Sequence, residues 1–289
     1  MIQLDLLTEK KIINVASVPK RSPFRYPGGK TWLVPYIRLW LSRIDKPGEF
    51  IEPFAGGAII GLTVAAENLA EHVTLVELND EVAAVWKTIL TGNAKWLAEE
   101  ISAFCLSPES ARAVLSKPAS SLKGKAFQTI LKNRINRGGI LAKGAGIMKY
   151  GECGKGIKSR WYPETLKRRI MDIVNYRDKI TFVEGDGIEL ARERSGSKRA
   201  AFFIDPPYTA YGKKAGARLY SDFELDHDEL FKVASKIKGN FLMTYENSEG
   251  VRRMAERHGF DYETVCMKNT HNAEMTELLI GRNLDWIRK

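Results

Sequence analysis

The tetrapeptide Asp205-Pro206-Pro207-Tyr208 could do chemistry because it joins a carboxylate, a rigid backbone and an aromatic ring. It directly follows the apolar run Ala200–Ile204, which has the composition of a buried strand. Two consecutive prolines fix the backbone and remove two N–H donors, which leaves an acceptor-rich corner. At the carboxyl end of a parallel strand, this corner would face the ligand crevice of an α/β sheet and could hold a planar group with an amino donor. A rigid strand-to-loop turn is the alternative interpretation.

A second candidate is the glycine turn Phe54-Ala55-Gly56-Gly57, which lies between a predicted strand and a predicted helix. Glycines at such a turn let the backbone approach a nucleotide-type cofactor closely. Neither the dinucleotide pattern G-x-G-x-x-G nor the phosphate-binding pattern G-x-x-x-x-G-K-[ST] is present, which leaves a cofactor without phosphates. Glu77 ends the next predicted strand, where an acid commonly accepts hydrogen bonds from a ribose. An ordinary strand end is the alternative for Glu77.

Two further motifs lie at the ends of predicted elements. Tyr26-Pro27-Gly28-Gly29-Lys30 offers a stacking ring, a flexible turn and a cation just before the first predicted helix. Asp186 follows a predicted strand, where a short acid could contact an adenine amino group or could cap the next helix. A turn with a solvated lysine is the alternative for the first motif.

The positive charge of the chain is concentrated in one segment. Residues 122–169 hold 13 Lys and Arg against Glu152 and Glu164 only, a net charge of +11, within a chain whose total is +10. One basic region on a balanced body is the pattern expected where a protein meets a polyanion. A solvated lysine-rich loop is the alternative.

Strand-like and helical patterns alternate along the chain, which predicts a parallel sheet covered by helices. The first helix is expected at 30–43. The predicted strands are 49–54, 73–78, 180–183, 200–204, 241–245, 262–267 and 277–280. The connection between the last two is too short for a parallel crossover, so we expect an antiparallel pair at the sheet edge. The predicted fold is a Rossmann-like, seven-stranded α/β sheet.

The alternation stops near residue 92 and returns at residue 180, which predicts an insertion. Its helical stretches are expected at 94–102, 126–133 and 164–176, around a run of glycines and lysines at 138–156. We therefore divide the chain into a catalytic domain of residues 1–93 and 179–289 and an inserted, mainly helical basic domain of residues 94–178. Within the insertion, Trp161-Tyr162-Pro163 is expected to be a small core anchor rather than a wedge.

Composition limits the class of protein. A chain of 289 residues with 44% hydrophobic and 28% charged residues should fold around a large core. Three cysteines without a C-x-x-C pair and four scattered histidines predict neither a disulfide framework nor a metal site. No apolar run reaches the length of a membrane span and the N-terminus lacks the order of a secretion signal, so we expect a cytoplasmic protein.

Taken in order, YPGGK, FAGGA, Glu77, the basic insertion, Asp186 and DPPY make the chain resemble the Dam-like (alpha-group) adenine-specific DNA methyltransferases, over about residues 24–283. The resemblance implies S-adenosyl-L-methionine as cofactor and double-stranded DNA as partner. It implies that Phe54, Ala55 and Gly56 line the methionine part, Glu77 holds the ribose, Leu78 packs on the adenine ring and Asp186 contacts it. The remaining cofactor-binding residues would be Tyr26, Lys30 and Asp205. The catalytic residues would be Asp205, Pro206, Pro207 and Tyr208, which hold the target base.

The insertion aligns in position with the target-recognition domain of that family, and Asn133-Arg134 followed by 136–139 is similar to a stretch near its start. The expected DNA-binding residues are Lys30, Arg134, Arg137, Lys143, Lys149, Lys155, Lys158 and Arg160. The lysines would hold phosphates, and some of the arginines would read guanines. One departure is Ala58, which stands where the family pattern F-x-G-x-G has its last glycine.

The chemistry expected from this resemblance is methyl transfer to the 6-amino group of an adenine that has left the helix stack. If Asp205 and the Pro206 carbonyl accept the two amino hydrogens, the nitrogen lone pair can be aimed at the methyl group. Such positioning requires no strong base or metal.

Two rival functions stay open from the sequence. One is a ribosomal RNA adenine methyltransferase, and the other is a catalytically inactive DNA-binding scaffold, which Ala58 would favour. A cytosine-amino methyltransferase is disfavoured because those enzymes resemble S-P-P rather than D-P-P at this site. The recognition sequence, the preference for hemimethylated DNA, a cognate restriction endonuclease and the oligomeric state are not specified by the sequence.

Overall fold

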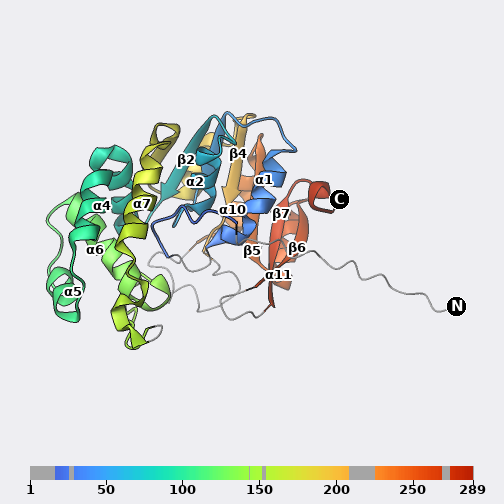
Figure 1. The fold of residues 1–289 in the computed structure, drawn as a ribbon. Coiled ribbons are helices and arrows are strands. Elements are labelled where there is room, and N and C mark those ends of the chain that lie inside the picture. Colours follow the sequence, from blue (N-terminus) through green and yellow to red (C-terminus); the bar gives the residue numbers. More distant parts are fainter. Residues whose placement is uncertain are drawn as a thin grey trace.

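The computed structural model describes residues 17–25, 29–142, 144–151, 154–207, 225–268 and 274–288. Within these residues the chain forms a seven-stranded sheet with the order β3-β2-β1-β4-β5-β7-β6 (Figure 1). The strands are β1 (Glu49–Glu52), β2 (His72–Glu77), β3 (Ile180–Glu184), β4 (Ala200–Ile204), β5 (Asn240–Glu246), β6 (Asp261–Lys268) and β7 (Glu274–Gly281). Strands β1 to β5 are parallel, and β7 runs antiparallel to both β5 and β6. The predicted sheet and its antiparallel edge are confirmed.

Two apolar cores cover the two faces of the sheet. Phe202 and Phe203 are neighbours in β4 and belong to different cores, because successive side chains of a strand point to opposite faces. The covering helices are α1 (Val34–Leu41), α2 (Ile59–Ala66), α3 (Asp80–Thr88) and the short α12 (Asp285–Arg288) on one face, and α8 (Gly187–Arg194), α10 (His227–Lys236) and α11 (Glu249–Arg257) on the other. All five residues of β4 are buried, as expected for a central strand covered on both faces.

The insertion lies to one side of the sheet (Figure 1). It holds α4 (Ala94–Ala103), α5 (Pro108–Leu115), α6 (Leu122–Ile135) and α7 (Pro163–Val174). Gly92, with a φ of +95°, turns the chain between α3 and α4, next to the predicted boundary. Leu97, Ile130 and Ile170 of the insertion belong to the same core as Trp86 of α3, so the inserted helices are anchored on the sheet domain.

The insertion differs from the sequence-based expectation in local detail. Helix α5 is not among the predicted helices, although Ser107 caps it with a side-chain hydrogen bond from the Ser110 N–H. The expected first helix begins as a 3-10 turn, η1 (Lys30–Leu33), before α1. Trp161 packs edge-on against Phe104 with ring centroids 5.9 Å apart, which agrees with a core anchor. Tyr162, which was expected to share this role, is 47% exposed and does not.

Candidate active site

The carboxyl ends of four neighbouring parallel strands bring together most of the predicted site. The sheet order β3-β2-β1-β4 places the residues that follow these strands side by side: Asp186, Glu77 with Leu78, the Phe54–Gly57 turn, and Asp205. Strand order reverses between β1 and β4, and a crevice forms outside the carboxyl ends of an α/β sheet at such a point. The predicted residues therefore lie at the place where open α/β sheets generally bind ligands.

Glu77 is fixed against the glycine turn. Its Oε2 accepts a hydrogen bond from the Gly56 N–H at 2.8 Å, and its Oε1 accepts one from the Asn79 N–H at 2.9 Å. Gly56 has a φ of +47°, a conformation that favours glycine, and its carbonyl accepts the Trp86 indole N–H at 2.9 Å. The Glu77 contact keeps the turn close to the end of β2, and the Trp86 contact ties it to α3.

Leu78, next to Glu77, is 54% exposed although it is a large apolar side chain. Phe54 is half-buried beside the turn. Asp186 caps α8, because its Oδ1 accepts hydrogen bonds from the Ile188 and Glu189 N–H groups at 2.7 and 3.3 Å. The alternative interpretation of Asp186 is thus observed, and its contact with a cofactor stays a prediction.

Asp205 lies in a cluster of polar side chains. Its Oδ1 accepts a hydrogen bond from the Thr244 hydroxyl at 2.7 Å and lies 3.1 Å from the Lys30 Nζ. The same Nζ is 3.4 Å from Glu277 Oε2 on β7, and the Lys30 side chain is 4% exposed. A buried ammonium group therefore bridges the acid that follows β4 and an acid on the antiparallel strand. Thr244 and Lys30 together fix the orientation of the Asp205 carboxylate.

Charge compensation keeps Lys30 protonated. Burial alone would lower the pKa of Lys30, but Asp205 and Glu277 raise it above its ordinary value. Two carboxylates around one ammonium group leave this three-residue cluster with one net negative charge. Nearby, burial raises the pKa of Glu52 well above its usual range, and its Oε2 accepts the Gly61 N–H at 2.8 Å.

Ala58 occupies a backbone conformation that favours glycine. Its φ and ψ are 49° and 32°, in the left-handed region, directly before α2. The alanine at this position therefore strains the backbone, because only glycine adopts this conformation without a steric cost. The side chain is 2% exposed and packs in the core.

The sequence of this region matches a known family. Residues 26–112 match the D12 class N6 adenine-specific DNA methyltransferases. The match covers the Lys30 motif, the glycine turn and Glu77, and it confirms the resemblance drawn from these motifs. Asp205 and most of the insertion lie outside the matched residues.

Comparison with solved structures finds methyltransferases at low sequence identity, each with a TM-score below 0.5. A Pyrococcus horikoshii protein assigned as an RNA methyltransferase has a TM-score of 0.41 and 13% identity, over 89% of this chain and 85% of that one. The rRNA methyltransferase AviRa from Streptomyces viridochromogenes has a TM-score of 0.38 and 11% identity over 89% and 86%. Precorrin-6y C5,15-methyltransferase from Geobacter metallireducens has a TM-score of 0.35 and 11% identity, over 85% of this chain and 85% of that one. No curated protein matches the chain in sequence.

The basic residues of the insertion divide into exposed and buried groups. Arg137, Lys149, Lys155 and Lys158 are exposed, and Arg160 is half-buried. Lys149, Lys155 and Lys158 line one hollow together with Arg112 of α5. The structure thus brings three of the predicted lysines together, on the side of the molecule that carries the insertion.

The prediction that Arg134 binds DNA is wrong. It is 3% exposed, and its Nη2 donates a hydrogen bond to the Pro23 carbonyl oxygen, so the side chain holds the N-terminal segment against α6. Burial first, and then Arg169, Arg25 and Arg160, lower the pKa of Arg134 to about 9. An Arg side chain in this position cannot read a base from the surface, contrary to the sequence-based expectation.

Tyr26, Lys143 and Tyr208 lie outside the described residues. Three residues with a place in the sites were not predicted: Glu277, Thr244 and Arg112. Each belongs to an ordinary strand or helix pattern. The pairing of β5 with β7 brings Glu277 and Thr244 to Lys30 and Asp205, and the packing of α5 brings Arg112 to the lysines of the hollow.

Within the described residues, no group of three His, Cys, Asp or Glu side chains could hold a metal ion, and no helix is long and apolar enough to cross a membrane.

Proposed function

We propose that the protein is a cytoplasmic DNA adenine methyltransferase that transfers a methyl group from S-adenosyl-L-methionine to the 6-amino group of a flipped adenine in double-stranded DNA. The observation that carries this proposal is the position of Asp205 at the switch point of the sheet. Its carboxylate is oriented there by Thr244 and Lys30, next to the glycine turn of a chain that matches the D12 family.

The residues at the ends of β1 and β2 fit the cofactor. Leu78 offers an exposed apolar surface for an adenine ring, and the adjacent Glu77 carboxylate can accept hydrogen bonds from a ribose. The turn at Gly56 lets the backbone come close to the methionine part of the cofactor. When bound, this cofactor supplies an activated methyl group.

Asp205 and the proline corner would hold the nucleophile. An adenine amino nitrogen is a poor nucleophile because its lone pair is delocalised into the ring. The Asp205 carboxylate and the Pro206 carbonyl can accept hydrogen bonds from its two N–H groups, which favours tetrahedral geometry at the nitrogen and aims its lone pair. The new N–C bond would form as the C–S bond of the methyl donor breaks, and the nitrogen would then release one proton to solvent. The net negative charge of the Lys30, Asp205 and Glu277 cluster stabilises the positive charge that develops on this nitrogen. Tyr208 would stack on the extruded base.

The insertion, residues 94–178, would serve as the target-recognition domain on the catalytic domain of residues 1–93 and 179–289. Its exposed Arg137, Lys149, Lys155 and Lys158 support contacts with phosphates, because few acids lie among them to neutralise their charge. The half-buried Arg160 and the predicted Lys143 would add to this surface. Lys30, which is buried beside Asp205, would act at the target base rather than on the DNA backbone.

The proposal is tested by incubating the purified protein with mixed-sequence duplex DNA and methyl-labelled S-adenosyl-L-methionine, followed by nucleoside analysis. Ribosomal RNA serves as a parallel substrate. The expected product is N6-methyladenine in DNA. Label in RNA alone would instead establish an RNA methyltransferase. Label in neither, together with no saturable binding of the cofactor, would identify an inactive scaffold.

A further inference from the structure

A hollow in the insertion is separate from the Asp205 site. It lies between α5, the end of α6 and the 3-10 helix η5 (Gly156–Arg160), and its volume is about 600 Å³. This volume lies in the range of small-molecule sites. None of the residues that line it belongs to the predicted cofactor or catalytic set, so a ligand bound there would not be the cofactor or the target base.

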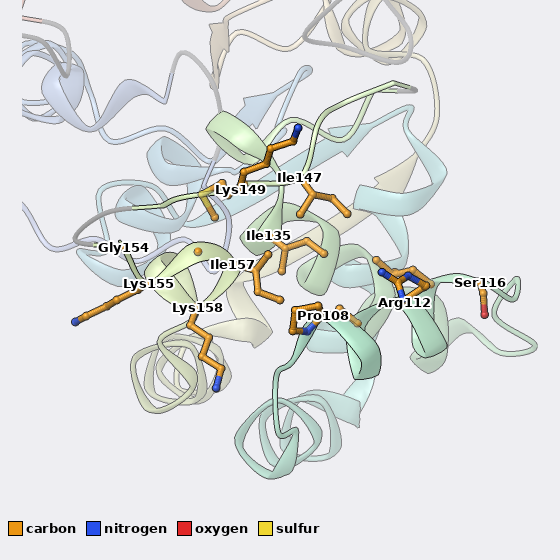
Figure 2. A pocket seen from close by; sticks show the side chains of 14 residues that line it. Pro108, Arg112, Ser116, Ile135, Ile147, Lys149, Gly154, Lys155, Ile157 and Lys158 are labelled. Atoms are coloured by element: carbon orange, nitrogen blue, oxygen red, sulfur yellow. The ribbon is translucent and has the colours of Figure 1, made fainter.

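The floor and walls of the hollow are aliphatic. Ala111 and Ile135 are buried at its floor, and Ile157 is half-buried beside them. Ile147 is 52% exposed, an unusual exposure for a large apolar side chain. Figure 2 shows Ile135, Ile157 and Pro108 close together, with Ile147 above them. Apolar surface that a folded chain leaves open in a concave site favours binding of an apolar body.

The rim of the hollow is cationic. Arg112, Lys149, Lys155 and Lys158 are exposed around it, and no carboxylate is among the described residues that line it. In Figure 2, Lys155 and Lys158 extend away from the aliphatic residues on one side, and Arg112 lies on another. A ligand that satisfies both features has an apolar body and negative charges at its periphery.

A nucleotide has this arrangement of chemistry. The two faces of a nucleobase are apolar, its polar edge can point to the open rim, and its phosphates lie outside the ring. The net charge of +11 over residues 122–169 favours a polyanion over a peptide with a few acids. We infer that the hollow binds one unstacked nucleotide of the DNA other than the target adenine, with its base against Ile147 and Ile157 and its phosphates on the basic rim. This inference rests on the proposed function, because it takes DNA as the substrate.

The inference is tested by DNA binding without the cofactor. Two labelled duplexes are compared by fluorescence anisotropy, one fully paired and one with a single unpaired thymidine at its centre. The wild-type protein should bind the duplex with the unpaired thymidine about 10-fold more tightly, because burial of the apolar face of a base against the aliphatic wall contributes on this scale. Ile147→Ser should reduce this preference to about 2-fold or less and leave the salt dependence unchanged, since it removes apolar wall and no charge.

Leu122→Ser is the matched control. Leu122 is 43% exposed on the same insertion but does not line the hollow, so its replacement should leave the preference intact. An undiminished preference in Ile147→Ser would overturn the inference. Equal affinity of the wild type for both duplexes, with displacement of DNA by an acidic peptide that carries an aliphatic anchor, would make the hollow a protein-docking site and would also overturn it.

A photocrosslink distinguishes this result from failure of the proposed function. The unpaired nucleotide is replaced by 4-thiothymidine, irradiated in the complex and located by mass spectrometry. Crosslinks to peptides that contain residues 108–116 or 147–158 are expected. Crosslinks confined to the catalytic domain would overturn the inference even if N6-methyladenine forms in DNA. The absence of DNA methylation with crosslinks at the hollow would overturn the proposed function alone.

Discussion

Charged groups are arranged in opposite ways at the catalytic end of the sheet and in the insertion. Lys30 is buried and lies between Asp205 and Glu277, so its charge is compensated within the chain. Around the hollow, by contrast, Arg112 and Lys155 are exposed and no carboxylate is among the described lining residues. A buried cluster in which a cation is paired with acids is suited to orienting groups, whereas exposed charge of one sign is available to a partner outside the chain.

This contrast predicts different consequences of substitution. Changes in the buried cluster should alter the rate of methyl transfer and leave DNA affinity nearly unchanged. Removal of exposed basic side chains from the insertion should alter DNA affinity and its salt dependence and leave the rate at saturating DNA nearly unchanged. Loss of DNA affinity from a change in the buried cluster, or loss of rate at saturating DNA from a change in the insertion, would contradict the distinction between an orienting site and a binding surface.

The largest effect is expected for Asp205→Ala. It removes the carboxylate that would accept an amino hydrogen of the target, so kcat should fall by about 10³-fold or more. The Kd for DNA should change by about 2-fold at most, because the affinity arises in the insertion. Single-turnover methylation and anisotropy titrations measure the two quantities. If DNA binding is lost and thermal unfolding shows a destabilised protein, Asp205 has a structural role.

Glu277→Gln should lower kcat by about 10- to 100-fold with little change in DNA affinity, because it removes the negative charge that the cluster contributes to the developing positive nitrogen. It should also change the pH profile. Glu277 helps to raise the pKa of Lys30, so without it the buried Lys30 should lose its proton at a lower pH. The alkaline limb of the rate profile should therefore shift to lower pH.

The control for this variant is Glu263→Gln on β6, which removes a carboxylate that pairs with Arg288 rather than Lys30. It should leave kcat and the alkaline limb unchanged. An unshifted alkaline limb in Glu277→Gln, with normal kcat, would mean that Glu277 only stabilises the fold around Lys30.

A moderate effect is expected when Lys155 and Lys158 are both replaced by Ala. Each lysine that meets a phosphate contributes about one unit to the slope of log affinity against log salt, so the slope should decrease by about 2. The rate at saturating DNA should not change. Lys95→Ala on α4, where the lysine is 78% exposed but outside the hollow, is the control. An unchanged slope in the double variant would show that these lysines are only solvated.

The same contrast explains how far the sequence could predict the molecule. Glu77, Asp186 and Asp205 could be located because each lies at or just after the end of an apolar strand, and parallel strands bring their carboxyl ends together. The antiparallel edge followed from the short connection between its strands. Glu277 could not be assigned, because its place beside Lys30 depends on the register of β7 with β5.

The insertion was less predictable for a physical reason. Its periodic helices could be located, but the exposure of a basic side chain depends on how those helices pack. Arg134 lies in a helical pattern with Lys132 beside it, yet it is buried against the N-terminal segment. Arg112 was passed over because α5 lies outside the basic segment and reaches the hollow only through its packing against α6.

The smallest effect is expected for Ala58→Gly, where two terms oppose each other. Relief of the left-handed backbone should gain about 1–2 kcal/mol, and loss of a buried methyl group together with the greater freedom of the unfolded chain should cost a similar amount. The free energy of unfolding should therefore change by only about 0.5 kcal/mol. Ala113→Gly, at an exposed position inside α5, has no strain to relieve and should lose about 1 kcal/mol. Urea unfolding of both variants measures the difference. A larger loss of unfolding free energy for Ala58→Gly than for Ala113→Gly would contradict backbone strain at the end of the glycine turn.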